Sequence, residues 1–222
     1  MTADKENRND KFVWQPGDVQ VISPEGGEVL WDFDADGMPS TEEVEEDGKQ
    51  TLNEAHFLHS TLRERILEHV FIGDALRRLW QLGIMDVEVL RSEFDAGGYD
   101  LVMSRLNVIR HIQFKSVLVD GKAARTSISL KLMEKPSGCV IWFVVTPELD
   151  CQSYLWLGGS PGESLQAVLR DDIKDLSVTM HTKCNAEGTK TERPNHRVVP
   201  RHRFEKLDDI DAVLRRLFGA LP

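Results

Sequence analysis

The chain has 222 residues, 41% of them hydrophobic, which suits one domain with an appendage or two small domains. Its net charge of −10 lies in residues 1–50, which hold 14 acids and 4 Lys or Arg, while the remaining residues hold 23 of each. The acidic balance therefore does not exclude a nucleic acid as a partner of residues 51–222. The sequence contains no apolar run of membrane-spanning length and begins with charged residues, so we expect neither a membrane segment nor a signal peptide.

The cysteines indicate a reducing compartment. Cys139, Cys151 and Cys184 are odd in number and lack Cys-x-x-Cys spacing. Reduced thiols in a cytoplasmic protein are the simplest interpretation.

Residues 1–53 are predicted to form an acidic, partly disordered N-terminal arm. Two short apolar runs flank Pro16-Gly17, a pattern typical of a small hairpin or an extended docking arm. Asp32, Asp34, Asp36, Gly37 and Glu43 have the spacing of a calcium loop, but Pro39 interrupts it and no helix is expected before it. We therefore interpret residues 32–50 as an acidic linker. One hypothesis is that the arm covers a basic face of its own chain; another is that it binds a protein partner.

The clearest predicted helix covers residues 54–82. Its apolar residues recur at three- and four-residue spacing, and Gly83 ends it. The predicted inward stripe consists of Leu67, Val70, Phe71, Ala75, Leu79 and Leu82. Glu68 lies at the edge of this stripe, either on a solvated flank or leaning over a sheet, and Glu64 is an alternative to it.

Several short runs predict strands, at residues 87–90, 98–103, 108–115, 139–145 and 154–157. The wholly apolar run 139–145 is typical of a strand buried on both faces. Residues 123–134 alternate like a strand but also suit a helix, and residues 207–218 predict an amphipathic helix with acids at its start and arginines at its end. The fold class is therefore α/β over residues 54–222, with a mixed central sheet flanked by helices.

Residues 98–103 and 108–115 bring together three chemically active side chains. Gln113 and Lys115 are two apart, so on a strand they project from one face roughly 7 Å apart. If the two strands are antiparallel neighbours, Asp100 lies beside this pair. An acid, an amide oxygen and an ammonium group would then share one patch.

This arrangement resembles the PD-(D/E)xK nuclease superfamily, which includes restriction endonucleases and Holliday-junction resolvases. Its pattern is an Asp on one strand and Glu-x-Lys or Gln-x-Lys on the next, often with a Glu on a preceding helix. The matching positions, between about residues 54 and 145, are Asp100, Gln113, Lys115 and Glu68. Longer runs such as GYDLV and RHIQFKS also look like a group of bacterial proteins, a resemblance that implies no activity.

The resemblance implies a restriction-endonuclease-like core that hydrolyses DNA phosphodiesters with Mg2+ or Mn2+. Asp100, Gln113 and the backbone carbonyl of Phe114 would hold the metal, and Lys115 would orient water or offset charge on the phosphate. Glu68 would contribute from the helix. Gln in place of Glu removes one negative charge, which weakens metal binding unless Glu68 compensates.

A purely structural role also accounts for the same residues. Gln113 and Lys115 would belong to the partly exposed face of a half-buried strand, with Asp100 as a salt-bridge partner. The rival function is a non-catalytic interaction or nucleic-acid-binding module on the same fold, with a vestigial site. Many members of the superfamily act as homodimers, and the sequence leaves the oligomeric state open.

Residues 181–203 hold 6 Lys or Arg against 2 acids and predict a basic loop that contacts phosphates. The nucleic-acid-binding candidates are Lys183, Lys190, Arg193, Arg197 and Arg201. A solvated loop with a short edge strand is the alternative. His181, Cys184, His196 and His202 only loosely suit zinc. The glycines at 158, 159 and 162 are not followed by Gly-Lys-Ser/Thr, which argues against nucleotide binding.

Overall fold

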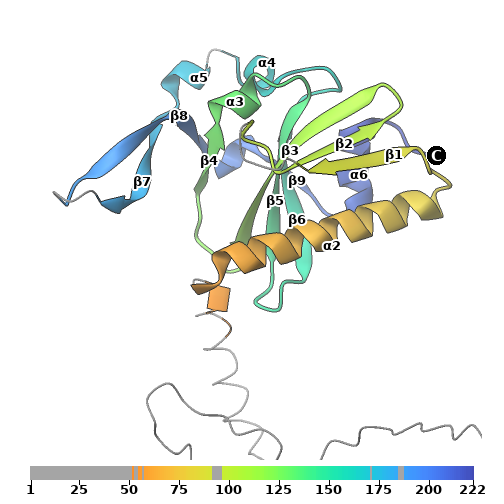
Figure 1. Ribbon diagram of the computed structural model, residues 1–222, viewed down its shortest axis with the longest axis horizontal. Coiled ribbons are helices and arrows are strands. Elements are labelled where there is room, and N and C mark those ends of the chain that lie inside the picture. Colours follow the sequence, from red (N-terminus) through yellow and green to blue (C-terminus); the bar gives the residue numbers. More distant parts are fainter. Residues whose placement is uncertain (1–51, 53–54, 57, 92–96, 171, 185–187) are drawn as a thin grey trace, which may run out of the picture. The chain divides into compact units, whose positions relative to one another are not determined.

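The computed structural model describes residues 52, 55–56, 58–91, 97–170, 172–184 and 188–222, without the side chains of residues 172, 174 and 182–184. The chain divides into residues Met1–Gly48 and Lys49–Pro222. The predicted acidic arm, with its hairpin and its calcium-loop lettering, lies outside the described residues. The fold below is that of the second unit (Figure 1).

A six-stranded mixed sheet forms the centre of this unit, in the strand order β1-β2-β3-β5-β6-β9. Its neighbours are antiparallel except β3 and β5, which run parallel with His111 opposite Gly138 and Leu118 opposite Val145. The α/β fold with a mixed sheet flanked by helices is therefore confirmed. The strands are β1 Val87–Arg91, β2 Leu101–Arg105, β3 Val108–Leu118, β5 Gly138–Val145, β6 Cys151–Gly158 and β9 Glu205–Leu207.

β5 lies in the interior of the sheet. All eight of its residues are buried, as the uninterrupted apolar run predicted. Its side chains alternate between two cores, with Ile141 and Phe143 on one face and Val140 and Trp142 on the other. A strand that is buried on both faces requires other elements to pack on both sides of the sheet, and different elements pack on the two sides.

Helices α2 (Ser60–Gln81) and α6 (Ile210–Phe218) cover one face of the sheet (Figure 1). α2 buries Leu67, Phe71, Ala75 and Leu79 at four-residue spacing, and Gly83, with φ +73°, follows its end. α6 begins where the Asp209 side chain accepts a hydrogen bond from the N–H of Ala212 at 2.7 Å. Arg78 joins the two helices through a bidentate pair with Asp211, at 2.6 and 2.8 Å.

The other face carries two short helices and a second, three-stranded sheet of order β4-β8-β7. These elements are β4 Arg125–Ser129, α3 Leu130–Met133, α4 Leu165–Leu169, β7 Val178–Cys184 and β8 Lys190–Pro200. Two small elements, α5 Asp172–Asp175 and η1 Arg201–Arg203, flank β7 and β8 in the chain. β7 and β8 form a hairpin at one side of the unit (Figure 1).

Three sequence expectations need correction. Val70, placed in the inward stripe, is exposed because it lies on the flank of that stripe, while residues 55, 56 and 58 are helical ahead of α2. Residues 123–134 contain a strand and a helix in succession, since Ser129 caps α3 with its hydroxyl. Much of the predicted basic loop at 181–203 is instead strand paired to strand. No helix among the described residues is long and apolar enough to cross a membrane.

Candidate active site

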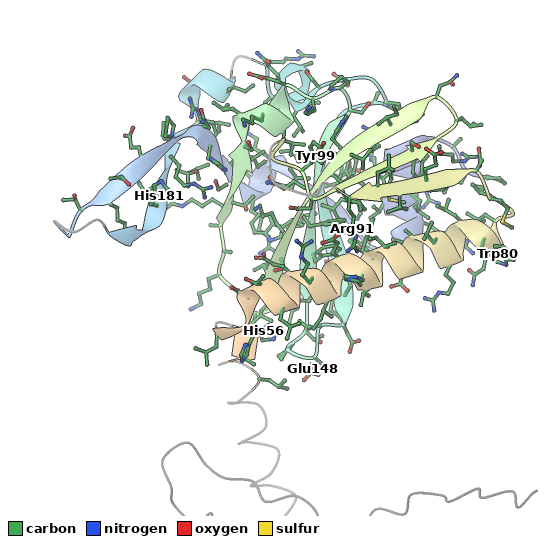
Figure 2. The ribbon with its side chains drawn as sticks, in the orientation of Figure 1. His56, Trp80, Arg91, Tyr99, Glu148 and His181 are labelled. Carbon is green, nitrogen blue, oxygen red and sulfur yellow. The ribbon has the colours of Figure 1, made fainter. Side chains whose placement is uncertain are left out.

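Glu68 is held in an almost fully buried position on the inner side of α2. Its Oε2 accepts a hydrogen bond from Arg65 Nη1 at 2.9 Å, one helical turn away. Arg91, at the end of β1, places Nε 3.2 Å from Oε1, outside hydrogen-bond geometry. Arg91 lies between α2 and the sheet (Figure 2). Two arginines therefore balance one buried carboxylate.

Asp100 sits where β2 begins, after a turn that only glycine fits. Gly98 has φ +70°, and a Cβ built on it would lie 2.4 Å from the Cβ of Ser129. The N–H of Asp100 donates to the carbonyl of Ile112 at 2.9 Å, and its Oδ2 accepts from the N–H of Phe114 at 2.7 Å. The carboxylate thus extends the β2–β3 ladder beyond the last paired residue.

This arrangement leaves one edge of β3 unpaired by β2 beyond Ile112. The register ends at Leu101 opposite Ile112, whereas β3 continues to Leu118 beside β5 alone. Because the N–H and C=O of one strand residue point to the same edge, the Phe114 carbonyl points to the side of Asp100. A backbone oxygen and a carboxylate therefore face one edge.

A cavity of about 170 Å³ opens at this edge, between α2 and the sheet. Its polar lining includes three carboxyl groups, from Glu64, Glu68 and Asp100, together with Lys115 and Arg65. Thr61, Leu67, Phe114, Ser116 and Phe143 complete the lining. The structure therefore brings Asp100, Lys115, Phe114 and Glu68 to one cavity, along with the alternative Glu64.

Gln113 is placed differently. It is buried, and it is not among the residues that line the cavity. Its Oε1 receives no hydrogen bond within the described part of the chain. A buried amide oxygen without a hydrogen-bond donor lowers the stability of the fold, so the Gln113 side chain is an unfavourable feature of β3.

The donor set suits a magnesium-type ion rather than a closed metal cage. Within the described residues, no group of three or more His, Cys, Asp or Glu side chains lies close enough to hold a metal. Mg2+ is satisfied by one or two carboxylates and keeps several waters. An exposed Asp100 carboxylate beside the Phe114 carbonyl meets that requirement, whereas a zinc or calcium site needs more protein ligands.

The predicted phosphate-binding residues lie on and after the β7–β8 hairpin. Lys190 is exposed, but Arg193 contacts His196 at 3.1 Å and Arg197 donates to the carbonyl of Pro194 at 2.7 Å. Arg201 stacks over the Trp142 ring, 5.8 Å from its centroid. The side chain of Lys183, like that of the zinc candidate Cys184, lies outside the described residues. The arginines are therefore partly engaged within the fold.

A larger cavity, of about 490 Å³, lies at the opposite end of the sheet. Gly158, Gly159, Arg170, Arg215 and Arg216 contribute to its lining. Arg216 is paired with Glu205, and the carboxylate of Glu163, which also lines the cavity, accepts from the N–H of Ser160 at 3.1 Å. Acids thus offset much of its positive charge.

Sequence reasoning missed Arg110, a fully buried arginine beside that larger cavity. Its guanidinium donates to three backbone carbonyls, those of Leu217 at 2.7 Å, Arg216 at 2.6 Å and Gly159 at 3.0 Å. Burial lowers the pKa of this guanidinium, which nevertheless stays protonated at any physiological pH. The signal was present in the alternation of β3, where Arg110 occupies the same inward face as Ile112 and Phe114.

Comparisons of the chain with models of protein families, with curated proteins and with solved structures found no match.

Proposed function

We propose that the chain is a metal-dependent phosphodiesterase acting on DNA, with its active site in the cavity beside Asp100 and Lys115. The observation that carries the proposal is that Asp100, Phe114 and Lys115 line one cavity at an open strand edge, together with the acids of helix α2. The order of elements supports it: a helix with a buried Glu, three antiparallel strands, then a crossover to a strand parallel to β3. Of this order, the nuclease resemblance implies the helix with Glu, the strand with Asp and the next strand with Gln-x-Lys.

Each residue of the cavity has a distinct task in this proposal. Asp100 and the Phe114 carbonyl would hold the divalent cation. When bound, such an ion makes water nucleophilic and offsets charge on the phosphate. Lys115 stabilises negative charge that develops on the phosphoryl oxygens. The hydrogen bond from Phe114 N–H fixes the orientation of the Asp100 carboxylate at the edge of the cavity.

Glu68 and Glu64 are positioning residues in this proposal. The Glu68 carboxylate is balanced by Arg65 and Arg91, whose side chains are 63% and 40% exposed. Those arginines can turn toward solvent or toward a phosphate without unpacking the core. They are therefore suited to bind the substrate backbone next to the cavity.

The decisive experiment measures cleavage of supercoiled, single-stranded and branched DNA by the full chain with Mg2+ or Mn2+. Lys115→Met removes the charge, and Asp100→Asn removes the carboxylate charge while keeping an oxygen acceptor for Phe114 N–H. We expect each variant to lose about 100-fold or more in rate. Lys122→Met, in the exposed loop between β3 and β4, is the matched control and should cleave like the wild type.

The outcomes separate the proposal from its rival. Metal-dependent cleavage that survives Asp100→Asn would place the metal elsewhere and overturn the site. Absence of cleavage by the wild type on all three substrates would favour the non-catalytic nucleic-acid-binding module. That module predicts DNA binding in EDTA that weakens with salt and with Lys190→Ala.

A further inference from the structure

Helix α2 has a second apolar face, directed away from the sheet. Its inner face buries Leu67, Phe71, Ala75 and Leu79. On the opposite side Leu62 is 59% exposed and Trp80 is 69% exposed. Trp80 lies at the outer side of the helix in Figure 2. A helix covering one sheet needs only one apolar stripe, so the second requires its own explanation.

The outer face follows a heptad pattern. Successive intervals of 4, 3, 4, 3 and 4 residues separate its members, the spacing of the a and d positions of paired helices. All six members are exposed, and only His69 is polar. We name this row the outer seam; it consists of Leu62, Ile66, His69, Gly73, Leu76 and Trp80. It runs for about 27 Å along the helix.

Gly73 occupies the middle of the outer seam. Glycine weakens the interior of a helix, so its presence there calls for a reason. A Cβ built on Gly73 would meet no atom of the described chain within 4 Å. Packing within those residues therefore does not demand glycine, whereas another helix crossing at this point would.

We propose that the outer seam pairs with the outer seam of a second copy of this chain, in antiparallel orientation about a two-fold axis near residue 71. That axis places Leu62 opposite Trp80, Ile66 opposite Leu76 and His69 opposite Gly73 of the second copy. Each a position then meets a d position. A large side chain meets a smaller one at both ends, and the missing side chain at Gly73 accommodates the imidazole.

Self-complementarity is what selects a second copy as the occupant. A two-fold interface requires that if residue i contacts residue j, then j contacts i. The outer seam meets this condition at all three pairs without any gap or insertion. Across the pair Arg63 approaches Arg77, and Asp74, 2.7 Å from Arg77, offsets part of their repulsion.

The contact area points to a reversible dimer. A single pair of helices this long, packed about 8–10 Å apart, buries less surface than the roughly 1,600 Å² of a standard stable interface. We therefore expect a dissociation constant in the micromolar range. The proposal is independent of nuclease activity, since it concerns the side of α2 away from the buried Glu68.

Sedimentation velocity of the full chain over a wide concentration range tests the interface. The wild type should convert from monomer to dimer, and Leu76→Glu should raise the dissociation constant at least tenfold. Leu106→Glu is the matched control, because Leu106 is 76% exposed on the β2–β3 turn and is not part of the outer seam. A monomer at every concentration, or equal weakening by both substitutions, would overturn the proposal.

Gly73→Leu distinguishes specific packing of the outer seam from nonspecific hydrophobic association. The monomer has room for this side chain and gains helix propensity, so its melting temperature should not fall. A merely adhesive face would associate more strongly after the change, whereas the paired outer seam would lose dimerisation because leucine collides with His69 of the other copy.

Orientation is tested by oxidative cross-linking in a Cys151→Ser, Cys184→Ser background. Leu62→Cys mixed with Trp80→Cys should form a disulfide between the two different variants. Neither variant alone should cross-link. Cross-linking of Leu62→Cys to itself would show a parallel pair and would overturn the antiparallel arrangement.

Discussion

A buried charge lies near each end of β3, Arg110 on the strand itself and Glu68 on helix α2, and the two charges are held in opposite ways. Arg110 donates to three backbone carbonyls, and Glu68, at the other end, contacts two arginine side chains. Backbone acceptors are fixed by the fold, whereas arginine side chains that are 40% and 63% exposed can rotate. The difference separates a tether fixed by the backbone from a buried carboxylate whose partners are mobile side chains.

Arg110→Met should produce the largest loss of stability. The substitution fills similar space but leaves the carbonyls of Gly159, Arg216 and Leu217 without their donor, two of them at the end of α6. We expect about 3–5 kcal/mol less free energy of unfolding in urea titrations. Arg216→Met, which removes an exposed ion pair, is the control and should cost under about 1 kcal/mol. Equal losses would show that Arg110 is not a tether.

Glu68→Gln should have a smaller effect, of about 1–2 kcal/mol. The amide can still accept a hydrogen bond from Arg65, and both arginines can turn their charge to solvent. Urea titration against Glu64→Gln, an exposed residue of the same cavity, measures the difference. A loss as large as that of Arg110→Met would mean that the Glu68 end is as rigid as the other and would weaken the contrast.

Cys139→Ala should have the smallest effect on stability, and it tests the surroundings of Arg110. Burial raises the pKa of its thiol to about 12 from 9.0, although the nearby Arg110 lowers it. The unfolded thiol ionises first as the pH rises, so stability is lost between about pH 9 and pH 12. Cys139→Ala should reduce the loss between pH 8 and pH 10 by about 1 kcal/mol.

Part of the loss of stability at alkaline pH comes from groups other than Cys139. Burial also raises the pKa of Cys151 and of Tyr154, so part of the alkaline loss should remain in Cys139→Ala. Urea denaturation curves of the wild type and the variant at pH 8 and pH 10 give the loss of unfolding free energy in each protein. An unchanged alkaline loss would mean that the Cys139 thiol ionises as readily in the folded chain as in the unfolded one.

Much of the fold was predictable because the spacing of apolar and charged residues within short segments specifies its elements. The stripe of α2, the apolar run of β5 and the acid-to-arginine gradient of α6 each need only neighbouring residues. The β7–β8 hairpin was not predicted, since Thr, Lys, Arg and His dominate it. Its strands are held by pairing, β8 with β4 and β7 with β8, rather than by burying an apolar face.

The candidate site was predictable in part for the same reason. The spacing of Gln113 and Lys115 and the position of Asp100 could be read from two adjacent strands. The partners of Glu68 could not, because Arg65 and Arg91 reach it from a helix turn and from the end of β1. Burial of Gln113 also depends on β5 and the elements beyond it, which no local pattern specifies.

The tight fit at Gly98 links the two sheets mechanically. Ser129, which ends β4 and caps α3, lies against the backbone that leads into Asp100. Because position 98 has no side chain, the end of β4 and the segment leading into Asp100 are in close contact beside the cavity. Since β4 pairs with β8, a continuous series of backbone contacts joins the β7–β8 hairpin to the segment that carries Asp100.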